Sequence, residues 1–199
     1  MTVVNSPKLP GRKIVVGVMG SASGPMSQAA MRKAFLLGQA IARAGCVTLT
    51  GACPGLPFES VRGAKAEGGL TLGISPAESE REHVSRYTSP RYYHDVIIFT
   101  GSGFMGREVT NIQSCDMVVI CGGRSGTLGE FAIAYDQGKI IGILEGTGGI
   151  VDEIRTIIRV IHKPTGSKII FDTDPERLVK RLLKLHEQYN NAEKPFIPG

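Results

Sequence analysis

Short runs of Val, Ile and other apolar residues alternate along the chain with longer stretches in which apolar positions recur every three or four residues. A short run that is apolar throughout its length is typical of a strand buried on both faces. Strands are therefore expected at residues 13–18, 46–50, 70–74, 96–100, 117–120, 140–144 and 168–171.

The stretches between these runs predict amphipathic helices, because apolar residues at i, i+3 and i+4 share one helical face. Helices are expected at residues 28–44, 58–66, 127–137, 150–161 and 175–189, with another that opens at 103–107 and ends near 115. The polar stretch 76–94 is expected to be a surface excursion with room for a short helix.

Regular alternation of buried strands and helices indicates an α/β fold with a doubly wound, mainly parallel, Rossmann-like sheet. A length of 199 residues suits a single domain with one substantial core. We expect this domain to span residues 13–189 and to bind a nucleotide or phosphate group. Residues 1–12 and 190–199, which contain Pro and Asn, are expected to be flexible.

Ligands of doubly wound sheets bind at the carboxyl ends of the strands, where the strand order reverses. The Gly-rich turns that follow the predicted strands are therefore the places to look for a site. In the first two of these turns the candidate ligand-binding residues are Gly20, Ser21, Gly51 and Gly55.

The turn Cys121-Gly-Gly-Arg-Ser-Gly-Thr127 carries the strongest signal for phosphate binding. It joins a strand to a helix, whose first turn presents unpaired N–H groups and the positive end of its dipole to an anion. The candidate residues are Gly122, Gly123, Arg124, Ser125, Gly126 and Thr127. Ser125 or Thr127 could instead cap the helix. The turn has no Walker-type Lys, which disfavours an ATPase, and a tight turn without a ligand is the alternative.

Gly101-Ser-Gly-Phe-Met-Gly106 follows a predicted strand and matches GxGxxG. A dinucleotide site of that type also needs an acid at the end of the next strand, about 20 residues further on. The next strand ends at Ile120-Cys121 without one, so an NAD-dependent dehydrogenase is disfavoured.

Glu130 and Arg107 are the candidate catalytic residues. Glu130 lies three residues after Thr127, and Thr-x-x-Glu is the signature of a capping box. Alternatively, the Glu130 carboxylate points into the cleft and stabilises a cationic sugar. Arg107 could pair with a phosphate or hold Glu130, because a guanidinium forks onto either oxyanion. The sequence leaves these alternatives open.

Charge and composition narrow the choice of partners. The net charge of +5 favours anionic ligands, but no dense run of Lys or Arg indicates a nucleic-acid surface. The four Cys show no CxxC spacing and predict neither a metal site nor a disulfide framework. The chain has no apolar run long enough for a membrane span and no secretory signal pattern, so a cytoplasmic protein without a membrane partner is expected.

The ordered motifs Thr50-Gly-Ala-Cys-Pro-Gly-Leu56, Gly73-Ile-Ser-Pro76, Arg107 and Gly122-Gly-Arg-Ser-Gly-Thr-Leu-Gly-Glu130 resemble those of the Lonely Guy (LOG)-like superfamily, long labelled lysine decarboxylases. The resemblance runs from about residue 14 to 161. The short Gly-Gly-Arg-Ser-Gly-Thr form and Gly146-Thr-Gly-Gly149 look closer to its molybdenum cofactor carrier branch. Lysine decarboxylation is excluded on mechanism, because it needs a Lys Schiff base and none of the Gly-rich turns contains a Lys.

The resemblance implies two functions for one phosphate site. Its enzymes hydrolyse nucleoside 5′-monophosphates to free base and ribose 5-phosphate without a cofactor, and those catalytic roles would fall on Arg107 and Glu130. The alternative is a carrier that binds the molybdenum cofactor, a pterin phosphate, without converting it. The resemblance also implies a homodimer or a homotetramer.

Overall fold

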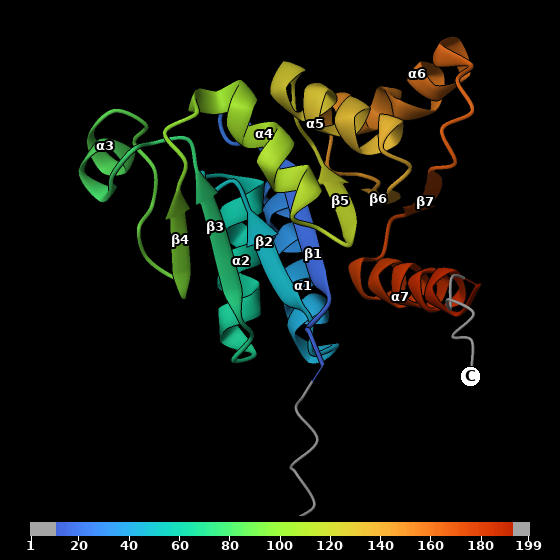
Figure 1. Cartoon of the computed structure of the whole chain (residues 1–199), viewed down its shortest axis with the longest axis horizontal. Coiled ribbons are helices and arrows are strands. Elements are labelled where there is room, and N and C mark those ends of the chain that lie inside the picture. The colour runs from blue at the N-terminus through green and yellow to red at the C-terminus, as the bar shows by residue number, and fades with distance from the viewer. Residues whose placement is uncertain (1–10, 193–199) are drawn as a thin grey trace, which may run out of the picture.

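The computed structural model describes residues 11–192 and contains one parallel sheet of seven strands with helices on both faces (Figure 1). The strands are β1 (Val15–Gly20), β2 (Val47–Thr50), β3 (Thr71–Ser75), β4 (Val96–Phe99), β5 (Met117–Cys121), β6 (Ile140–Leu144) and β7 (Lys168–Asp172). The helices are α1 (Gln28–Arg43), α2 (Leu56–Ala66), α3 (Glu80–Ser85), α4 (Gly103–Gln113), α5 (Ser125–Asp136), the 3-10 helix η1 (Gly149–Glu153), α6 (Ile154–Ile161) and α7 (Pro175–Ala192). The predicted α/β architecture is confirmed.

The strand order is β4-β3-β2-β1-β5-β6-β7, and every neighbouring pair is parallel. Strands β2, β3 and β4 are added in turn on one side of β1. The chain then crosses back, and β5, β6 and β7 are added in turn on the other side of β1. The order therefore reverses between β1 and β5, where Gly20 at the end of one strand is in register with Cys121 at the end of the other. Parallel sheets of this type place their ligand at this point.

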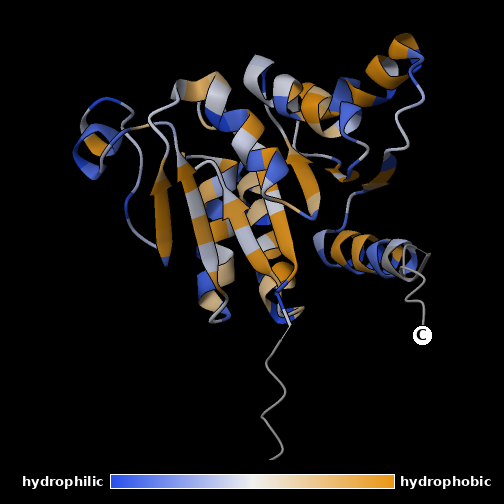
Figure 2. Ribbon diagram, in the orientation of Figure 1, coloured by the Kyte–Doolittle hydropathy of each residue, from blue (hydrophilic) through white to orange (hydrophobic). Residues whose placement is uncertain are grey.

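Two apolar cores lie on opposite faces of the sheet, which Figure 2 shows as a mainly orange layer between helices of mixed colour. Alternate residues of β5 divide between them: Met117 and Val119 face the α1 and α7 side, whereas Val118 and Ile120 face the α4 and α5 side. The strands are buried on both faces because successive side chains point in opposite directions.

Glycines allow α1 and α2 to pack closely on one face. A Cβ atom at Gly38 would lie 1.8 Å from the Ser60 carbonyl oxygen, and one at Gly63 would lie 1.9 Å from the Phe35 carbonyl oxygen. The two helix backbones are therefore in contact, which fixes α2 and the turn before it against the sheet.

The polar excursion contains the short helix α3, and a buried histidine anchors it. His83 is 0% exposed, its Nδ1 lies 2.8 Å from Ser75 Oγ and its Nε2 lies 3.2 Å from the Pro90 carbonyl oxygen. Nδ1 thus joins this polar stretch to the end of β3, and Nε2 joins α3 to the later part of the same stretch.

Several helix boundaries differ from the sequence prediction. The helices expected to begin at 58 and 127 begin at Leu56 and Ser125, and the helix expected at 150–161 divides into η1 and α6. The last helix continues to Ala192. Most of the segments expected to be flexible, residues 1–10 and 193–199, lies outside the described residues, whereas Arg12 forms an ion pair with Asp116.

Candidate functional site

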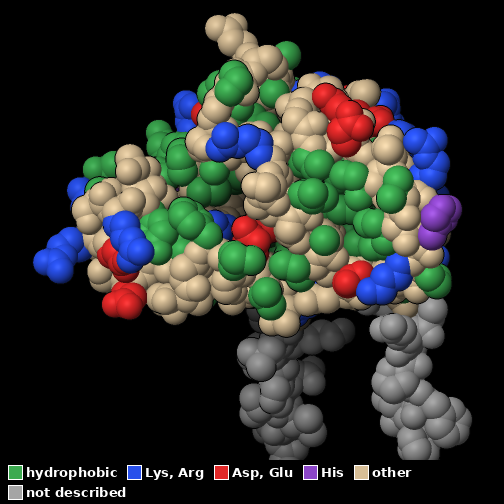
Figure 3. All heavy atoms as spheres, turned by 90° about the horizontal axis from the view of Figure 1, so that it is seen from above, with side chains coloured by type: hydrophobic (Ala, Val, Ile, Leu, Met, Phe, Trp, Pro, Cys, Tyr) green, Lys and Arg blue, Asp and Glu red, His purple; other side chains and the backbone are tan. Residues whose placement is uncertain are grey.

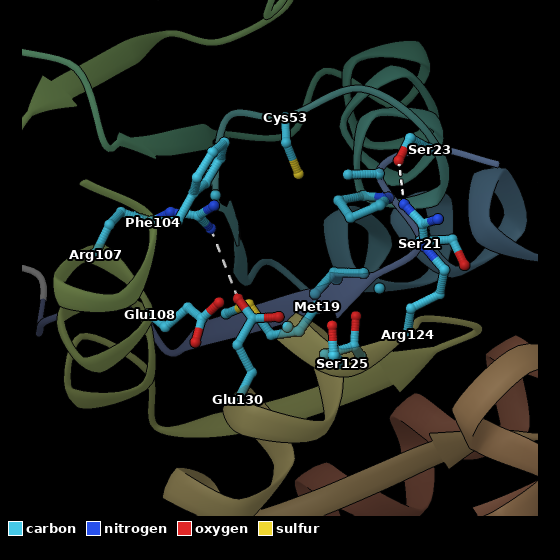
Figure 4. A pocket seen from close by; sticks show the side chains of 17 residues that line it. Met19, Ser21, Ser23, Cys53, Phe104, Arg107, Glu108, Arg124, Ser125 and Glu130 are labelled. Carbon is cyan, nitrogen blue, oxygen red and sulfur yellow. Dashed lines mark hydrogen bonds and ion pairs between the residues drawn. The ribbon is translucent and has the colours of Figure 1, made fainter. Parts of the chain in front are cut away.

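A cavity of about 500 Å³, which we call the ligand pocket, opens where the strand order reverses, at the carboxyl ends of β1 and β5. Its walls are the turns after β1 and β2 together with α4 and α5 (Figure 4). Figure 3 views the molecule from above relative to Figure 1 and shows basic and acidic side chains around a hollow on this face. Among the sequence candidates, the residues that line the pocket are Gly20, Ser21, Gly51, Arg107, Arg124, Ser125, Gly126, Thr127 and Glu130.

Three candidates lie behind this surface and shape the turns. A Cβ atom at Gly55 would lie 2.1 Å from the Ser21 carbonyl oxygen, so the first two turns are in contact. The Gly122 amide donates to Thr147 Oγ1 at 2.8 Å, and the Gly123 amide donates to Ser21 Oγ at 2.6 Å. These two amides hold neighbouring turns together, and they are directed at side-chain hydroxyls.

The amino terminus of α5 supplies the hydrogen-bond donors that face the ligand pocket. Within the described residues, the amides of Ser125, Gly126 and Thr127 donate no hydrogen bond, and no side chain caps the helix. Unpaired amides at a helix terminus attract an anion. Arg124 stands beside them as the residue before the helix, and its guanidinium donates to Ser23 Oγ at 2.6 Å.

The capping alternatives for Ser125, Thr127 and Glu130, which the sequence left open, do not hold in the structure. Helix α5 begins at Ser125, two residues earlier than expected, so Thr127 lies inside the first turn and Arg124 occupies the cap position. The Glu130 side chain consequently sits one turn further along the helix and points into the ligand pocket (Figure 4). Of the two alternatives for Glu130, this geometry excludes the capping box.

Glu130 and Arg107 form a buried pair from two different helices. Arg107 Nη1 lies 3.6 Å from Glu130 Oε1, and the side chains are 7% and 8% exposed. The amide of Asn111, on the same helix as Arg107, donates to Glu130 Oε1 at 3.4 Å. Burial raises the pKa of the Glu130 carboxyl to about 7, although the charge of Arg107 acts in the opposite direction. Glu130 can therefore hold or release a proton near neutral pH.

Two polar atoms of this cluster have no partner. Arg107 Nε and Asn111 Oδ1 are both buried, and neither forms a hydrogen bond within the described residues. Buried polar atoms are normally paired, because an unpaired one costs about 1–3 kcal/mol. The cluster of Arg107, Asn111 and Glu130 therefore keeps one donor and one acceptor unpaired and out of contact with solvent.

Gly51 makes room for Arg107. A Cβ atom at this position would lie 1.7 Å from Arg107 Nη1 and 2.6 Å from its Cζ. The glycine of the second turn thus allows the guanidinium from α4 to reach the pocket across the end of β2.

Eight residues that line the pocket were not among the sequence candidates, and Cys53, Phe104 and Glu108 are three of them. Burial raises the pKa of the Glu108 carboxyl, and its oxygens lie next to α5, 3.2 Å from a Cβ atom built on Gly126 or on Gly129. Burial raises the pKa of the Cys53 thiol to about 11, so it stays protonated at neutral pH. Glu108 directly follows Arg107 in the sequence, and this adjacency was the one available signal.

The chain is similar to proteins of one family along most of its length. The model of the SLOG cluster4 family matches residues 13–179. An uncharacterized protein from Archaeoglobus fulgidus is 32% identical over 130 residues, which are 65% of this chain and 79% of that protein.

Two solved structures extend the comparison. The molybdenum cofactor binding protein from the phototrophic bacterium Rippkaea orientalis is 29% identical with a TM-score of 0.70, and the match covers 87% of this chain and 98% of that one. The molybdenum cofactor carrier protein from Chlamydomonas reinhardtii is 29% identical with a TM-score of 0.68, and the match covers 87% and 99%. Among residues 11–192, no helix combines the length and the apolar character that a membrane span requires.

Proposed function

Because the chain belongs to the SLOG cluster4 family, we propose that it binds a phosphorylated pterin, the molybdenum cofactor, and carries it without converting it. The observation that carries this proposal is the amino terminus of α5, where three unpaired amides and Arg124 face the ligand pocket. The two solved structures that match along almost their whole length are a binder and a carrier of this cofactor.

The pocket residues fit such a ligand. The phosphate would accept hydrogen bonds from the amides of Ser125, Gly126 and Thr127, with the guanidinium of Arg124 alongside. The pterin would lie toward Phe104 and the pair of Arg107 and Glu130, which line the same cavity. A volume of about 500 Å³ is ordinary for a site of this kind.

The phosphate position is tested by removing one amide and nothing else. Ser125 is the first residue of α5, a position that tolerates proline because its N–H has no partner inside the helix. Ser125→Pro deletes the amide hydrogen, whereas Ser125→Ala deletes only the hydroxyl. In fluorescence titrations, we expect Ser125→Pro to bind a phosphorylated pterin at least about 10-fold more weakly than Ser125→Ala, since a hydrogen bond to a charged group contributes about 1.5–3 kcal/mol.

The same pterin without its phosphate is the ligand control, and both variants should bind it equally. Equal binding of the phosphorylated pterin by Ser125→Pro and Ser125→Ala would place the phosphate elsewhere.

A second function, hydrolysis of nucleoside 5′-monophosphates, is favoured by the buried Glu130 carboxyl with its pKa near 7. In that reaction the bond between the sugar C1′ and the base breaks, the base leaves with a proton, and water adds to the sugar. Glu130 would supply the proton, or as a carboxylate stabilise the cationic sugar, and Arg107 would orient it.

Chromatography of the protein incubated with a panel of nucleoside 5′-monophosphates tests this second function. Release of free base by the parent, with a loss of at least about 100-fold in Glu130→Gln, would establish hydrolysis. If no base is released while phosphorylated pterin still binds, the carrier function stands alone.

A further inference from the structure

A second cavity of about 580 Å³, which we call the second pocket, adjoins the ligand pocket at the same sheet edge. The turn after β1, the turn after β5 and the turn after β6 form its walls. Ser21, Ser23 and Arg124 line both cavities, so these residues stand between them.

Glycines with left-handed backbone hold the second pocket open. Gly148 and Gly149 have φ angles of 76° and 62°, and a Cβ atom at Gly149 would lie 2.3 Å from the Gly123 carbonyl oxygen. The Ile150 amide donates to that same carbonyl at 2.9 Å. The turn after β6 is thereby fixed against the turn after β5, so backbone contacts of the fold define the shape of the second pocket.

The charges of the two pockets differ. Arg107, Glu108 and Glu130 line the ligand pocket alone, whereas Asp152 is the one charged residue that lines only the second pocket among the described residues. Asp152 is exposed, and no hydrogen bond or ion pair of its side chain is present within the described part of the chain. A free carboxylate repels a second phosphate and accepts hydrogen bonds from N–H groups.

We propose that the two pockets together bind a dinucleotide whose diphosphate bridge lies at Arg124 and the amino terminus of α5. One half of the ligand occupies the ligand pocket. The other half is a guanine nucleoside in the second pocket, where the adjacent N–H groups of the guanine edge donate to Asp152. This inference rests on the phosphate position proposed above.

The placement of Arg124 supports a bridge at this point. Its guanidinium is exposed and donates to Ser23 Oγ, a neutral partner that a diphosphate oxygen can replace with a stronger, charge-assisted bond. Dinucleotide-binding sheets likewise hold the diphosphate at the Gly-rich turn of the switch point, with the ligand extending to both sides.

The test compares the affinities of P1,P2-diguanosine diphosphate and GDP by calorimetry. GDP carries the same two phosphorus atoms and lacks only the second nucleoside. We expect the dinucleotide to bind at least about 10-fold more tightly. Because the guanine of either ligand would occupy the second pocket, Asp152→Asn should weaken the binding of GDP and of the dinucleotide, each by at least about 10-fold.

Glu153→Gln is the matched control, because Glu153 is the exposed neighbour of Asp152 on η1 and does not line either pocket. It should leave both affinities as in the parent. Asp152→Asn should change the affinities for diadenosine diphosphate and ADP by less than about 3-fold, since the adenine edge offers fewer donors to a carboxylate.

The outcomes separate the two proposals. If GDP binds and the dinucleotide binds no more tightly, or if Asp152→Asn keeps the parent's affinity for both guanine ligands, the second pocket does not hold a guanine nucleoside and this inference falls alone. If neither GDP nor a phosphorylated pterin binds, the phosphate site fails and this inference falls with it.

Discussion

Glu130 is the residue in which burial and charge conflict most strongly. Its side chain is 8% exposed on a helix that faces the pocket, with the Arg107 guanidinium and the Asn111 amide nearby. A carboxyl in such a place prefers to be neutral, and its pKa rises from 4.5 to about 7. The residue can therefore donate a proton near neutral pH, and its ionisation destabilises the folded protein.

The stability of the protein should fall with rising pH because of Glu130. Below pH 4.5 the carboxyl is protonated in both the folded and the unfolded chain. Between pH 4.5 and about 7 only the unfolded chain releases this proton, so each pH unit lowers the free energy of unfolding by about 1.4 kcal/mol. Glu130→Gln removes this contribution. Between pH 4.5 and pH 8, we expect the free energy of unfolding of the variant to increase relative to that of the parent by roughly 3 kcal/mol.

Urea denaturation of both proteins across this pH range measures the difference. A difference that does not change with pH would mean that the Glu130 carboxyl has the same pKa in the folded and in the unfolded chain. Since the comparison is between two otherwise identical chains, the titration of all other groups cancels.

At the scale of elements, the site depends on contacts between turns that are far apart in the sequence. The turn after β2 and helix α4 meet at Gly51 and Arg107, and the turns after β5 and β6 meet where the Gly122 amide donates to Thr147. Thr147 Oγ1 also donates to the Leu144 carbonyl at 2.6 Å. These contacts between turns keep the walls of the ligand pocket in place.

Gly51→Ala tests the contact between the turn after β2 and α4. The added Cβ atom would overlap Arg107 Nη1, so the guanidinium must leave its place beside Glu130. We expect phosphorylated pterin to bind at least about 10-fold more weakly to Gly51→Ala, as measured by fluorescence titration.

The control is to introduce Gly51→Ala into a protein that already carries Arg107→Ala. If Gly51 acts only by giving space to Arg107, then Gly51→Ala added to Arg107→Ala should cost no further affinity. An equal additional loss in that background would assign Gly51 a role independent of the guanidinium.

At the scale of the whole molecule, one part of the sheet is uncovered. Val96 and Ile98 of β4 are in register with Leu72 and Ile74, which pack on the α4 and α5 side. Strand β4 is at the edge of the sheet, and on this face Val96 and Ile98 are 51% and 47% exposed. Helix α4 adds further exposed apolar side chains, those of Phe104, Met105 and Val109.

Exposed apolar area of this kind is typical of an interface, and we expect the protein to form a homodimer or homotetramer through α4 and β4. Met105 is 81% exposed, so Met105→Lys should disturb the interface without disturbing the fold. Light scattering should give a multiple of 21.3 kDa for the parent and a mass closer to the monomer for the variant.

Val160→Lys is the control for this experiment, because Val160 is 72% exposed on α6. It should keep the mass of the parent. A parent protein that scatters as a monomer at all concentrations would contradict the expectation.

Much of this organisation follows from local patterns. The seven strands, the parallel sheet and the ligand site at its carboxyl edge were predicted from runs of apolar residues and from glycines. The superfamily expected from the motifs is confirmed at the level of SLOG proteins. Such features are local or periodic in the chain, and the sequence expresses them directly.

Other features depended on the tertiary structure. The sequence could not choose between a capping box and a pocket residue for Glu130, because that choice depends on where α5 begins, and the turn contacts of Gly122 and Gly123 set this point. The part played by Glu108 and the space that Gly51 gives to Arg107 arise only when α4 lies across the ends of the strands.

The sequence by itself therefore determined the fold class, the sheet edge at which the ligand pocket lies and about half of the residues that line this pocket, because strand burial and glycine turns are encoded within short segments. Only the tertiary structure decided which amides remain free, which carboxyl is buried and how two pockets share Arg124. Those properties depend on distances between segments more than 20 residues apart, and no local pattern records such distances.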